Sequence, residues 1–178
     1  MRAIAFTGMP GAGKTVAVDV ARELGIPVVR MGDAVWDEVR NRGLPLVHEH
    51  VGRVATEMRE KYGRGIWAER TSDKVLDLAV PTVVIDGVRT EEEVDVFRAR
   101  LGHDFTLVAI HASPATRLRR ILERQREDDA RNAQEFHARD ERELGWGIGR
   151  VIALADVMLV NEEHPERLAA QVREILKG

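Results

Sequence analysis

Short apolar runs alternate with longer amphipathic stretches along this chain of 178 residues. The apolar runs are rich in Val and Ile and end at turn residues, which is typical of strands buried on both faces of a parallel sheet. They predict five strands, over Ala3–Thr7, Ile26–Met31, Val80–Ile85, Phe105–Ile110 and Asp156–Val160. The amphipathic stretches predict helices, starting with Gly13–Leu24, which Gly25 would end. We therefore expect an α/β fold, a mostly parallel five-stranded sheet flanked by helices.

Two of the stretches between strands are longer than a single crossover helix requires. Residues 33–79 predict helices around Ala34–Arg42, Val51–Lys61 and Trp67–Leu78. Residues 114–155 lie between the fourth and fifth predicted strands and are again mostly helical in pattern. We expect one domain over residues 1–178 with two helical excursions, at about 33–79 and about 114–149.

Composition and charge remove several classes of function. The chain has 27 basic and 30 acidic residues, a net charge of -3, so charge does not indicate a nucleic-acid partner. It has no cysteine, which excludes disulfides, thiolate zinc sites and a cysteine nucleophile. No apolar run approaches the ~20 residues that span a bilayer. The start of the chain lacks the pattern of a targeting segment, and we expect a cytoplasmic protein whose oligomeric state is open.

The first predicted strand leads into a glycine-rich loop, Gly8-Met9-Pro10-Gly11-Ala12-Gly13-Lys14-Thr15, which satisfies G-x-x-x-x-G-K-[ST] at every fixed position. Its glycines let backbone N–H groups turn inward around anionic oxygens, and the following helix adds its positive end. Lys14 has the reach for the β- and γ-phosphates. The Thr15 hydroxyl suits Mg²⁺, which prefers oxygen ligands. The loop predicts ATP and Mg²⁺ as cofactors; the alternative is a glycine-rich turn that binds nothing.

A carboxylate ends the third predicted strand, at Asp86. Ligands of open α/β sheets bind beyond the C-terminal ends of the strands, so we expect Asp86 to hold Mg²⁺ beside the loop. The alternative is a turn former or a helix cap. Gly87 permits a tight turn, after which Arg89 can point back and bind a phosphate. The alternative for Arg89 is an ion pair with the acidic run Glu91–Glu93.

Arginines recur on the second excursion. Ser113-Pro114 is a helix start, and Arg117, Arg120 and Arg124 follow at helical spacing. A closing helix of this kind would supply positive charge to a transferring phosphoryl group and would exclude water. Arg139 and Arg142 on the next predicted helix are further candidates. The alternative is a solvated face, with ion pairs to Glu123, Glu127, Asp128 and Asp129.

Together these segments resemble the nucleoside-monophosphate kinase superfamily. The loop Gly8–Thr15 resembles that of adenylate kinases, Met31-Gly32-Asp33 resembles their T-G-D segment, and Asp86-Gly87-Val88-Arg89 resembles their D-G-x-x-R segment. Residues 155–161 are similar to the end of dephospho-coenzyme A kinases. Nearly the whole chain resembles an archaeal P-loop kinase family related to both. Its further features recur here as Val29–Asp33, His111–Pro114, Asp128-Asp129, Arg139–Leu144 and Gly149–Asp156.

The resemblance implies roles for individual residues. Asp33 opens an excursion that binds the phosphoryl acceptor, and Arg89 holds the acceptor's phosphate. The second excursion resembles the adenylate kinase lid, whose R-x-x-x-R pair matches Arg120 and Arg124. One arginine of such a pair lies against adenine and the other on the phosphates. The stretch Gly145-Trp146-Gly147-Ile148-Gly149 follows this lid and no strand precedes it, which predicts a hinge.

One position departs from the adenylate kinase pattern. The arginine that lies three residues after the Asp of T-G-D in those enzymes is Trp36 here. An aromatic ring cannot replace a cation on a phosphate, but it can stack on a base. The alternative is a core tryptophan. Arg40, one helical turn further on, is our candidate for the missing charge.

We therefore expect an ATP-dependent phosphotransferase that acts on a nucleoside monophosphate or dephospho-coenzyme A. Lys14, Asp86, Arg120 and Arg124 would serve transfer, and Asp33, Trp36, Arg40, Gly87, Arg89 and Arg139 would bind the acceptor. A phosphate acceptor needs no strong base, whereas a hydroxyl acceptor needs one, for which Asp33 is the best candidate. The alternative is an adenylate-kinase-like ATPase that acts as a switch in RNA metabolism or with a protein partner. A non-catalytic nucleotide-binding module is a third possibility.

Overall fold

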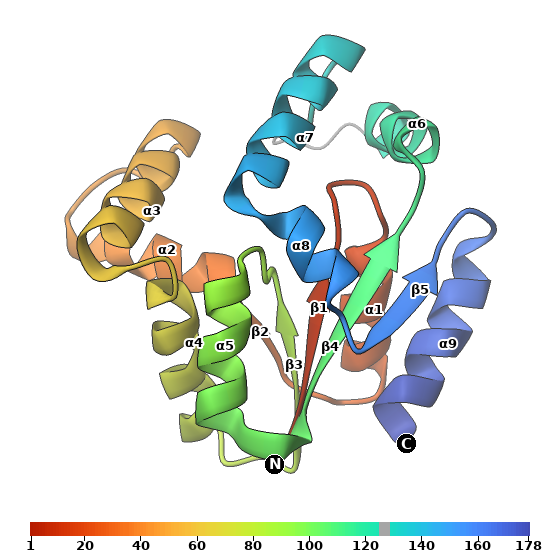
Figure 1. Cartoon of the computed structure of the whole chain (residues 1–178), viewed down its shortest axis with the longest axis horizontal. Helices are drawn as coiled ribbons and strands as arrows, with labels where there is room; N and C mark the ends of the chain where they lie inside the picture. The colour runs from red at the N-terminus through yellow and green to blue at the C-terminus, as the bar shows by residue number, and fades with distance from the viewer. Residues whose placement is uncertain (125–128) are drawn as a thin grey trace.

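The computed structural model describes residues 1–124 and 129–178. Strands and helices alternate along the chain, as Figure 1 shows. The elements are β1 (Arg2–Thr7), α1 (Lys14–Glu23), β2 (Val28–Arg30), α2 (Met31–Asn41), α3 (His48–Tyr62), α4 (Ile66–Asp77), β3 (Thr82–Asp86), α5 (Glu91–Leu101), the 3-10 turn η1 (Gly102–Asp104), β4 (Phe105–His111), α6 (Pro114–Arg124), α7 (Ala133–Trp146), α8 (Ile148–Ala153), β5 (Val157–Val160) and α9 (Pro165–Lys177).

The five strands form one sheet in the order β2-β3-β1-β4-β5. Every neighbouring pair is parallel, so the five predicted strands are confirmed and the sheet is parallel throughout. β1 lies in the middle, between β3 and β4. The carboxyl ends of these three strands therefore meet at one edge of the sheet, where the phosphate loop follows β1.

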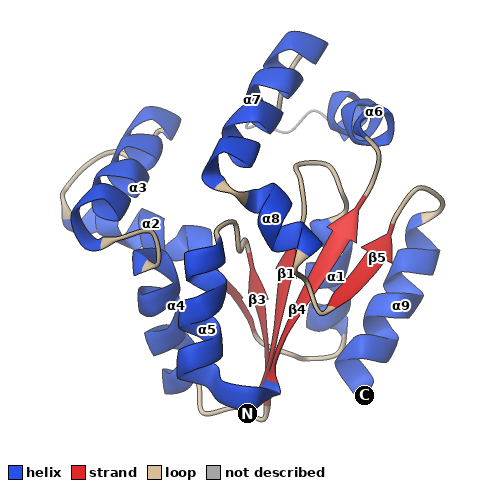
Figure 2. Ribbon diagram, viewed as in Figure 1, coloured by secondary structure: helices blue, strands red, loops and turns tan. Residues whose placement is uncertain are grey.

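The sheet has a separate apolar core on each face, because successive side chains of a strand point to opposite sides. Ala3 and Ala5 of β1 pack into the core that α2, α3, α4, α5 and α8 cover. Ile4 and Phe6 pack into the other core, under α1 and α9. Figure 2 shows these helices on either side of the strands. Burial on both faces explains why the strands read as continuous apolar runs.

The second strand and the helix after it differ from the sequence prediction. β2 covers only Val28–Arg30, and α2 already begins at Met31, three residues before the predicted start at Ala34. β2 is an edge strand that pairs with β3 alone, so few ladder bonds hold it extended. Burial of Met31 in the core favours turning into the helix at this point.

The two long stretches are helical, as predicted. α2, α3 and α4 lie between β2 and β3, while α6, α7 and α8 lie between β4 and β5. In Figure 1, α6 and α7 lie above the carboxyl edge of the sheet, and α2 and α3 lie to one side of it. Within residues 1–124 and 129–178, no helix has the length and apolar character needed to cross a bilayer.

Candidate functional site

The phosphate loop is enclosed so tightly that its glycines cannot carry side chains. Gly13 has φ 118°, and a Cβ built there would lie 2.3 Å from Nδ2 of Asn161. Gly8 has φ 150°, and its Cβ would lie 2.3 Å from the carbonyl oxygen of Ile110. The Asn161 amide also donates to the carbonyl of Ala12, at 2.8 Å. The loop after β1 is thus shaped by β4 and by the residue after β5, both distant in sequence.

Lys14 is the first residue of α1, and its ammonium folds back over its own loop. It donates to the carbonyl oxygens of Gly8 and Met9, the latter at 3.4 Å. Burial lowers the pKa of Lys14 to about 8, although the nearby carboxylate of Asp86 opposes the shift. The loop therefore holds a desolvated cation where P-loop proteins bind phosphate.

Asp86 ends β3 directly beside this loop, since it pairs in register with Phe6 of β1. Its Oδ1 is buried and has no hydrogen-bond partner among the residues that the structure describes. Burial raises the pKa of Asp86, and the charges of Lys14, Arg30 and Arg89 oppose the rise. An unpartnered carboxylate oxygen beside the Thr15 hydroxyl is a donor set that fits a hard cation such as Mg²⁺. Thr15 and Asp86 are the residues that would hold it.

A cleft of about 230 Å³ lies over the loop, and charged side chains from several segments line it. A neighbouring hollow of about 510 Å³ shares Thr15 and Asp86 with this cleft. Thr15, Gly87 and the three loop glycines, Gly8, Gly11 and Gly13, line the cleft as well. The charged members are Lys14, Asp86, Arg89, Arg124, Arg139 and Glu143.

Arg89 reaches the cleft because Glu93 shapes the turn before α5. The buried Glu93 carboxylate accepts from the backbone N–H of Arg89 at 2.8 Å and of Thr90 at 3.1 Å. Thr90 and Glu93 thereby form a capping box. The Arg89 side chain does not pair with the acidic run, which was the sequence alternative; its Nε lies 3.5 Å from Glu143 Oε2. Its guanidinium also lies 5.4 Å from the Trp146 ring centroid.

The arginines of α6 face three different surroundings. Arg117 is buried and donates to both carboxylate oxygens of Asp140, at 2.8 and 2.6 Å, and to Pro10 of the loop at 3.1 Å. Arg120 donates to the carbonyl of Asn161 at 2.9 Å and does not line the cleft. Arg124 lines the cleft and also binds Asp129, at 2.7 and 2.6 Å. Of these three arginines, Arg124 alone lines the cleft, because Arg117 is held by Asp140 and the loop, and Arg120 by Asn161.

Some of the ion pairs predicted from the sequence as the alternative for these arginines are present. The buried carboxylate of Asp129 binds Arg124 and lies 3.8 Å from Arg139, and both arginines line the cleft. Of the other acids proposed as partners, Glu127 and Asp128 lie outside the described residues, and Glu123 interacts electrostatically with Arg120. Asp129 thus holds two arginines side by side at the cleft.

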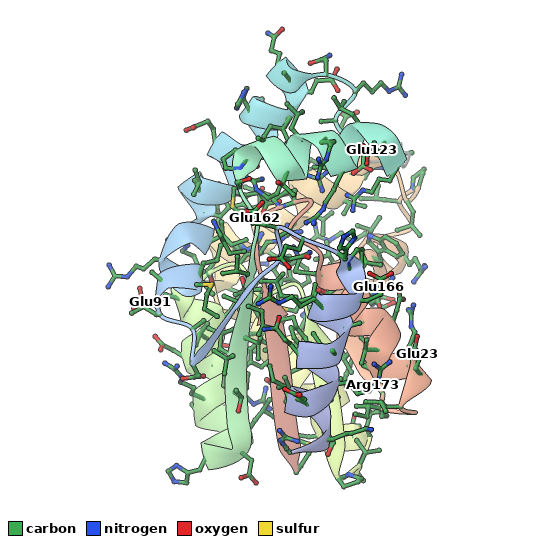
Figure 3. All side chains as sticks on the ribbon, turned by 90° about the vertical axis from the view of Figure 1, so that its right-hand side faces the viewer. Glu23, Glu91, Glu123, Glu162, Glu166 and Arg173 are labelled. Atoms are coloured by element: carbon green, nitrogen blue, oxygen red, sulfur yellow. The ribbon has the colours of Figure 1, made fainter. Side chains whose placement is uncertain are left out.

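The first turn of α6 is anchored to the loop after β5. The Glu162 carboxylate accepts from the backbone N–H of Ser113 and from the Thr116 hydroxyl, the latter at 2.6 Å. Figure 3 labels Glu162 at this junction, close below α6. The hydrogen bond from Thr116 holds the pKa of Glu162 below its usual range. The base of the excursion is consequently tied to the sheet, and the break between α7 and α8 falls at Gly147, with φ 103°.

The residues predicted to bind the acceptor on α2 are spread out. Asp33 lies in the first turn of α2, and its charge contributes to the raised pKa of Asp86. Trp36 is 43% exposed, so the alternative of a core tryptophan is wrong. Arg40 lies on the surface and pairs with Asp37 at 3.1 Å. Among the described residues that line the cleft, none comes from α2.

The structure adds site residues that the sequence did not single out. Glu143 lines the cleft from α7, and Arg30 lines a neighbouring hollow that shares Thr15 and Asp86 with the cleft. Glu143 was hidden in the charged run Asp140–Glu143, whose acids look alike in sequence. Asp140 and Glu143 are three residues apart and therefore lie on the same face of α7, which is buried. Glu141 lies on an exposed face, and the sequence alone does not show which face is buried.

Comparisons with known proteins agree with this geometry. The AAA domain family model (AAA_17) matches residues 7–137. UPF0200 proteins from Hyperthermus butylicus and Thermoplasma acidophilum are each 46% identical over 97% of this chain, covering 92% and 94% of those proteins. A relative of the same name from Methanocaldococcus jannaschii is 42% identical over 99% of this chain and 90% of that protein.

Solved structures share the fold at low sequence identity. A shikimate kinase from Bacteroides thetaiotaomicron matches with a TM-score of 0.62 at 18% identity, covering 99% of both chains. A gluconokinase from Sinorhizobium meliloti matches with a TM-score of 0.58 at 16% identity, over 99% of this chain and 91% of that one. The fold is therefore that of P-loop small-molecule kinases.

Proposed function

This chain belongs to the UPF0200 family, whose relatives named above are archaeal, and from that premise we propose that it is an ATP-dependent phosphotransferase. It would move the γ-phosphoryl group of ATP to a nucleotide-like small molecule, either a nucleoside monophosphate or dephospho-coenzyme A. The observation that carries the proposal is the cleft, where a complete phosphate loop, the Asp86 carboxylate and three arginines converge. Oδ1 of Asp86 has no hydrogen-bond partner among the described residues.

Each part of the cleft has a role in phosphoryl transfer. Loop N–H groups and Lys14 bind the phosphates, and Thr15 and Asp86 hold Mg²⁺, which neutralises charge on the β- and γ-phosphates when bound. Arg89, Arg124 and Arg139 offer cations to the equatorial oxygens and to the acceptor. Of the pair Arg120 and Arg124, Arg124 lines the cleft and suits the phosphates, so we assign contact with the adenine ring to Arg120, beside the loop after β5.

The acceptor would enter from the side of α2. Asp33 lies in electrostatic range of Asp86, and the exposed Trp36 on the same helix is available to stack on a base. Arg40 is a weaker candidate than the sequence suggested, because it pairs with Asp37 at the surface. Arg89 is the better-placed cation for an acceptor, since it lines the cleft itself.

The test is ADP formation from ATP and Mg²⁺ by the purified chain, with and without acceptors, and with Lys14→Ala as the blank. The acceptors are AMP, the other nucleoside and deoxynucleoside monophosphates, and dephospho-coenzyme A. A Lys14-dependent rise with one acceptor supports the phosphotransferase. ADP release that is indifferent to every acceptor would instead favour an ATPase that works with a macromolecular partner.

A further inference from the structure

Two carboxylates line the cleft, and the proposed function uses only one of them. Asp86 is accounted for as the ligand of Mg²⁺. Glu143 has no such task, yet its side chain is only 4% exposed. Its Oε2 is buried and accepts no hydrogen bond in the part of the chain that the structure describes; the nearest cationic atom is Arg89 Nε, at 3.5 Å. Burying a carboxylate oxygen without a hydrogen bond is unfavourable, so the position of Glu143 in this cleft needs an explanation.

The position of Glu143 relative to the phosphate loop is fixed by its helix. Asp140, one turn earlier on α7, accepts two hydrogen bonds from Arg117, which also donates to Pro10 of the loop. Arg139, one turn before Glu143, lines the same cleft. The charges of Asp86 and Glu143 both act to raise the pKa of Lys14, so both acids lie within electrostatic range of its ammonium. The carboxylate is therefore held near the site where the γ-phosphate would bind.

The presence of this acid bears on the chemical class of the acceptor. A phosphate acceptor arrives as an anion, and its attacking oxygen is already ionised, so it needs no base. The Glu143 carboxylate would repel such an anion and would offset the charge of Arg89, the cation best placed to hold it. A hydroxyl acceptor carries no charge at its attacking oxygen, so Glu143 would not repel it. It must also lose a proton, so it needs a base.

We propose that the acceptor presents an alcohol hydroxyl and that Glu143 is the general base that takes its proton. The inference rests on the proposed phosphotransferase function and narrows its acceptor. In the step, the acceptor O–H bond breaks and its proton passes to Glu143. The acceptor oxygen bonds to the γ-phosphorus as the bond from that phosphorus to the β,γ-bridging oxygen breaks. The electron pair leaves with ADP, and Glu143 then releases the proton to solvent.

Asp33 is the competing base, because it was the sequence candidate for a hydroxyl acceptor. It does not line the cleft among the described residues, whereas Glu143 does. Asp33 lies on α2, next to the edge strand, and its charge contributes to the raised pKa of Asp86. Replacing each acid by its amide separates the two assignments.

The experiment compares Glu143→Gln with Glu141→Gln, an exposed acid two residues earlier on the same helix. ATP binding is measured with a fluorescent ATP analogue. The rate of ATP hydrolysis is measured without an acceptor, so that water acts as the simplest hydroxyl nucleophile. We expect Glu143→Gln to lower hydrolysis about 10²–10⁴-fold without weakening ATP binding, because the amide removes a negative charge near the γ-phosphate site. Glu141→Gln should behave as wild type. Added formate should restore part of the rate of Glu143→Ala, which a merely structural role would not explain.

Product chemistry gives a second, independent readout. The chain is incubated with ATP, Mg²⁺ and either nucleoside monophosphates or hydroxyl acceptors such as dephospho-coenzyme A, and ³¹P NMR distinguishes a phosphomonoester from a phosphoanhydride. We expect only the monoester. Transfer to a phosphate oxygen, full hydrolysis by Glu143→Gln, or loss of rate in Asp33→Asn alone would overturn the assignment. So would a wild-type chain that binds ATP but turns over neither water nor any acceptor. A chain that fails to bind ATP would contradict the proposed function itself.

Discussion

The phosphate loop and the first helical excursion, α2 to α4, differ in how the rest of the chain surrounds them. At Gly8 and Gly13 an added Cβ would meet other segments at 2.3 Å. At Gly32 of α2 and Gly52 of α3, nothing among the described residues lies within 4 Å of such an atom. The loop is shaped by close contacts from β4 and the end of β5, while these two glycines of the excursion lie in open space among the described residues.

The ion pairs of the two regions differ in the same way. The Arg117–Asp140 pair, which joins α6, α7 and the loop, has side chains that are 4% and 12% exposed. The pairs that Asp37 makes with Arg40 and Lys74 on the excursion have side chains about half exposed. The surround of the phosphate loop should therefore tolerate little change, whereas the exposed pairs of Asp37 should tolerate substitution.

The largest expected effect comes from removing the buried pair. Arg117→Ala leaves the Asp140 carboxylate buried without its partner, so the free energy of unfolding should fall by about 3–5 kcal/mol. Urea denaturation measures it. Arg40→Ala, at an exposed pair, should change the free energy of unfolding by less than about 1 kcal/mol. If the two variants lost the same free energy of unfolding, the buried and exposed ion pairs would not differ in their contribution to stability.

A methyl group in the loop should have the next largest effect. Gly13→Ala forces a side chain onto Asn161 at a φ that L-residues avoid, which should cost about 1–3 kcal/mol of stability. ATP affinity should fall as well, because the loop N–H groups move. Thermal unfolding and titration with a fluorescent ATP analogue measure the two effects. Unchanged values for both would mean that the loop is more adaptable than its contacts indicate.

Asp86→Asn should separate stability from function. Burial raises the pKa of Asp86, so the ionised form costs stability, and this cost disappears as pH falls through the raised pKa. At neutral pH the amide should therefore raise the Tm of the nucleotide-free chain. It should also abolish the added stability that ATP with Mg²⁺ confers. A variant that ATP and Mg²⁺ still stabilise would remove Asp86 from the metal site.

The pH dependence of ATP binding should report Lys14. Its pKa is lowered to about 8 by burial, so the ammonium loses its proton between pH 7 and pH 9 in the free chain. At pH 9 about one molecule in ten carries the charge, and ATP affinity should be about tenfold weaker than at pH 7. Lys14→Arg keeps its charge throughout this range and should show a flat profile. A flat profile for the wild type would contradict the lowered pKa.

The smallest expected effect has the opposite sign. Gly52→Ala places a methyl group on an exposed face of α3, where it meets none of the described residues, and should stabilise the chain by about 0.5–1 kcal/mol. Thermal unfolding checks it, with the destabilised Gly13→Ala as the contrasting glycine variant. A destabilised Gly52→Ala would show that α3 packs against a surface.

Much of the fold could be read from local pattern. The apolar runs that became β1, β3 and β4 were placed to within two residues, because strands buried on both faces leave a continuous signal. β5 was placed equally well although it is a partly exposed edge strand. β2 was overestimated, because it pairs with β3 over three residues only and α2 begins at Met31. The residues of the phosphate loop were recognised in full because the spacing of its glycines, Lys14 and Thr15 is itself the signal.

The sequence by itself determined the phosphate-binding end of the molecule: the loop, the strand that precedes it, the helix that follows, and the carboxylate that closes β3. The signals for these features are local in the chain: glycines that permit positive φ angles, the apolar pattern of a strand, and the residues that start a helix. The tertiary structure alone decided which of the many charged side chains face the cleft. It buried Arg117 against Asp140, turned Glu143 inward and left Glu141 and Arg40 outside. Charged residues on amphipathic helices are interchangeable in sequence until packing selects the buried face, and that selection involves segments far apart in the chain.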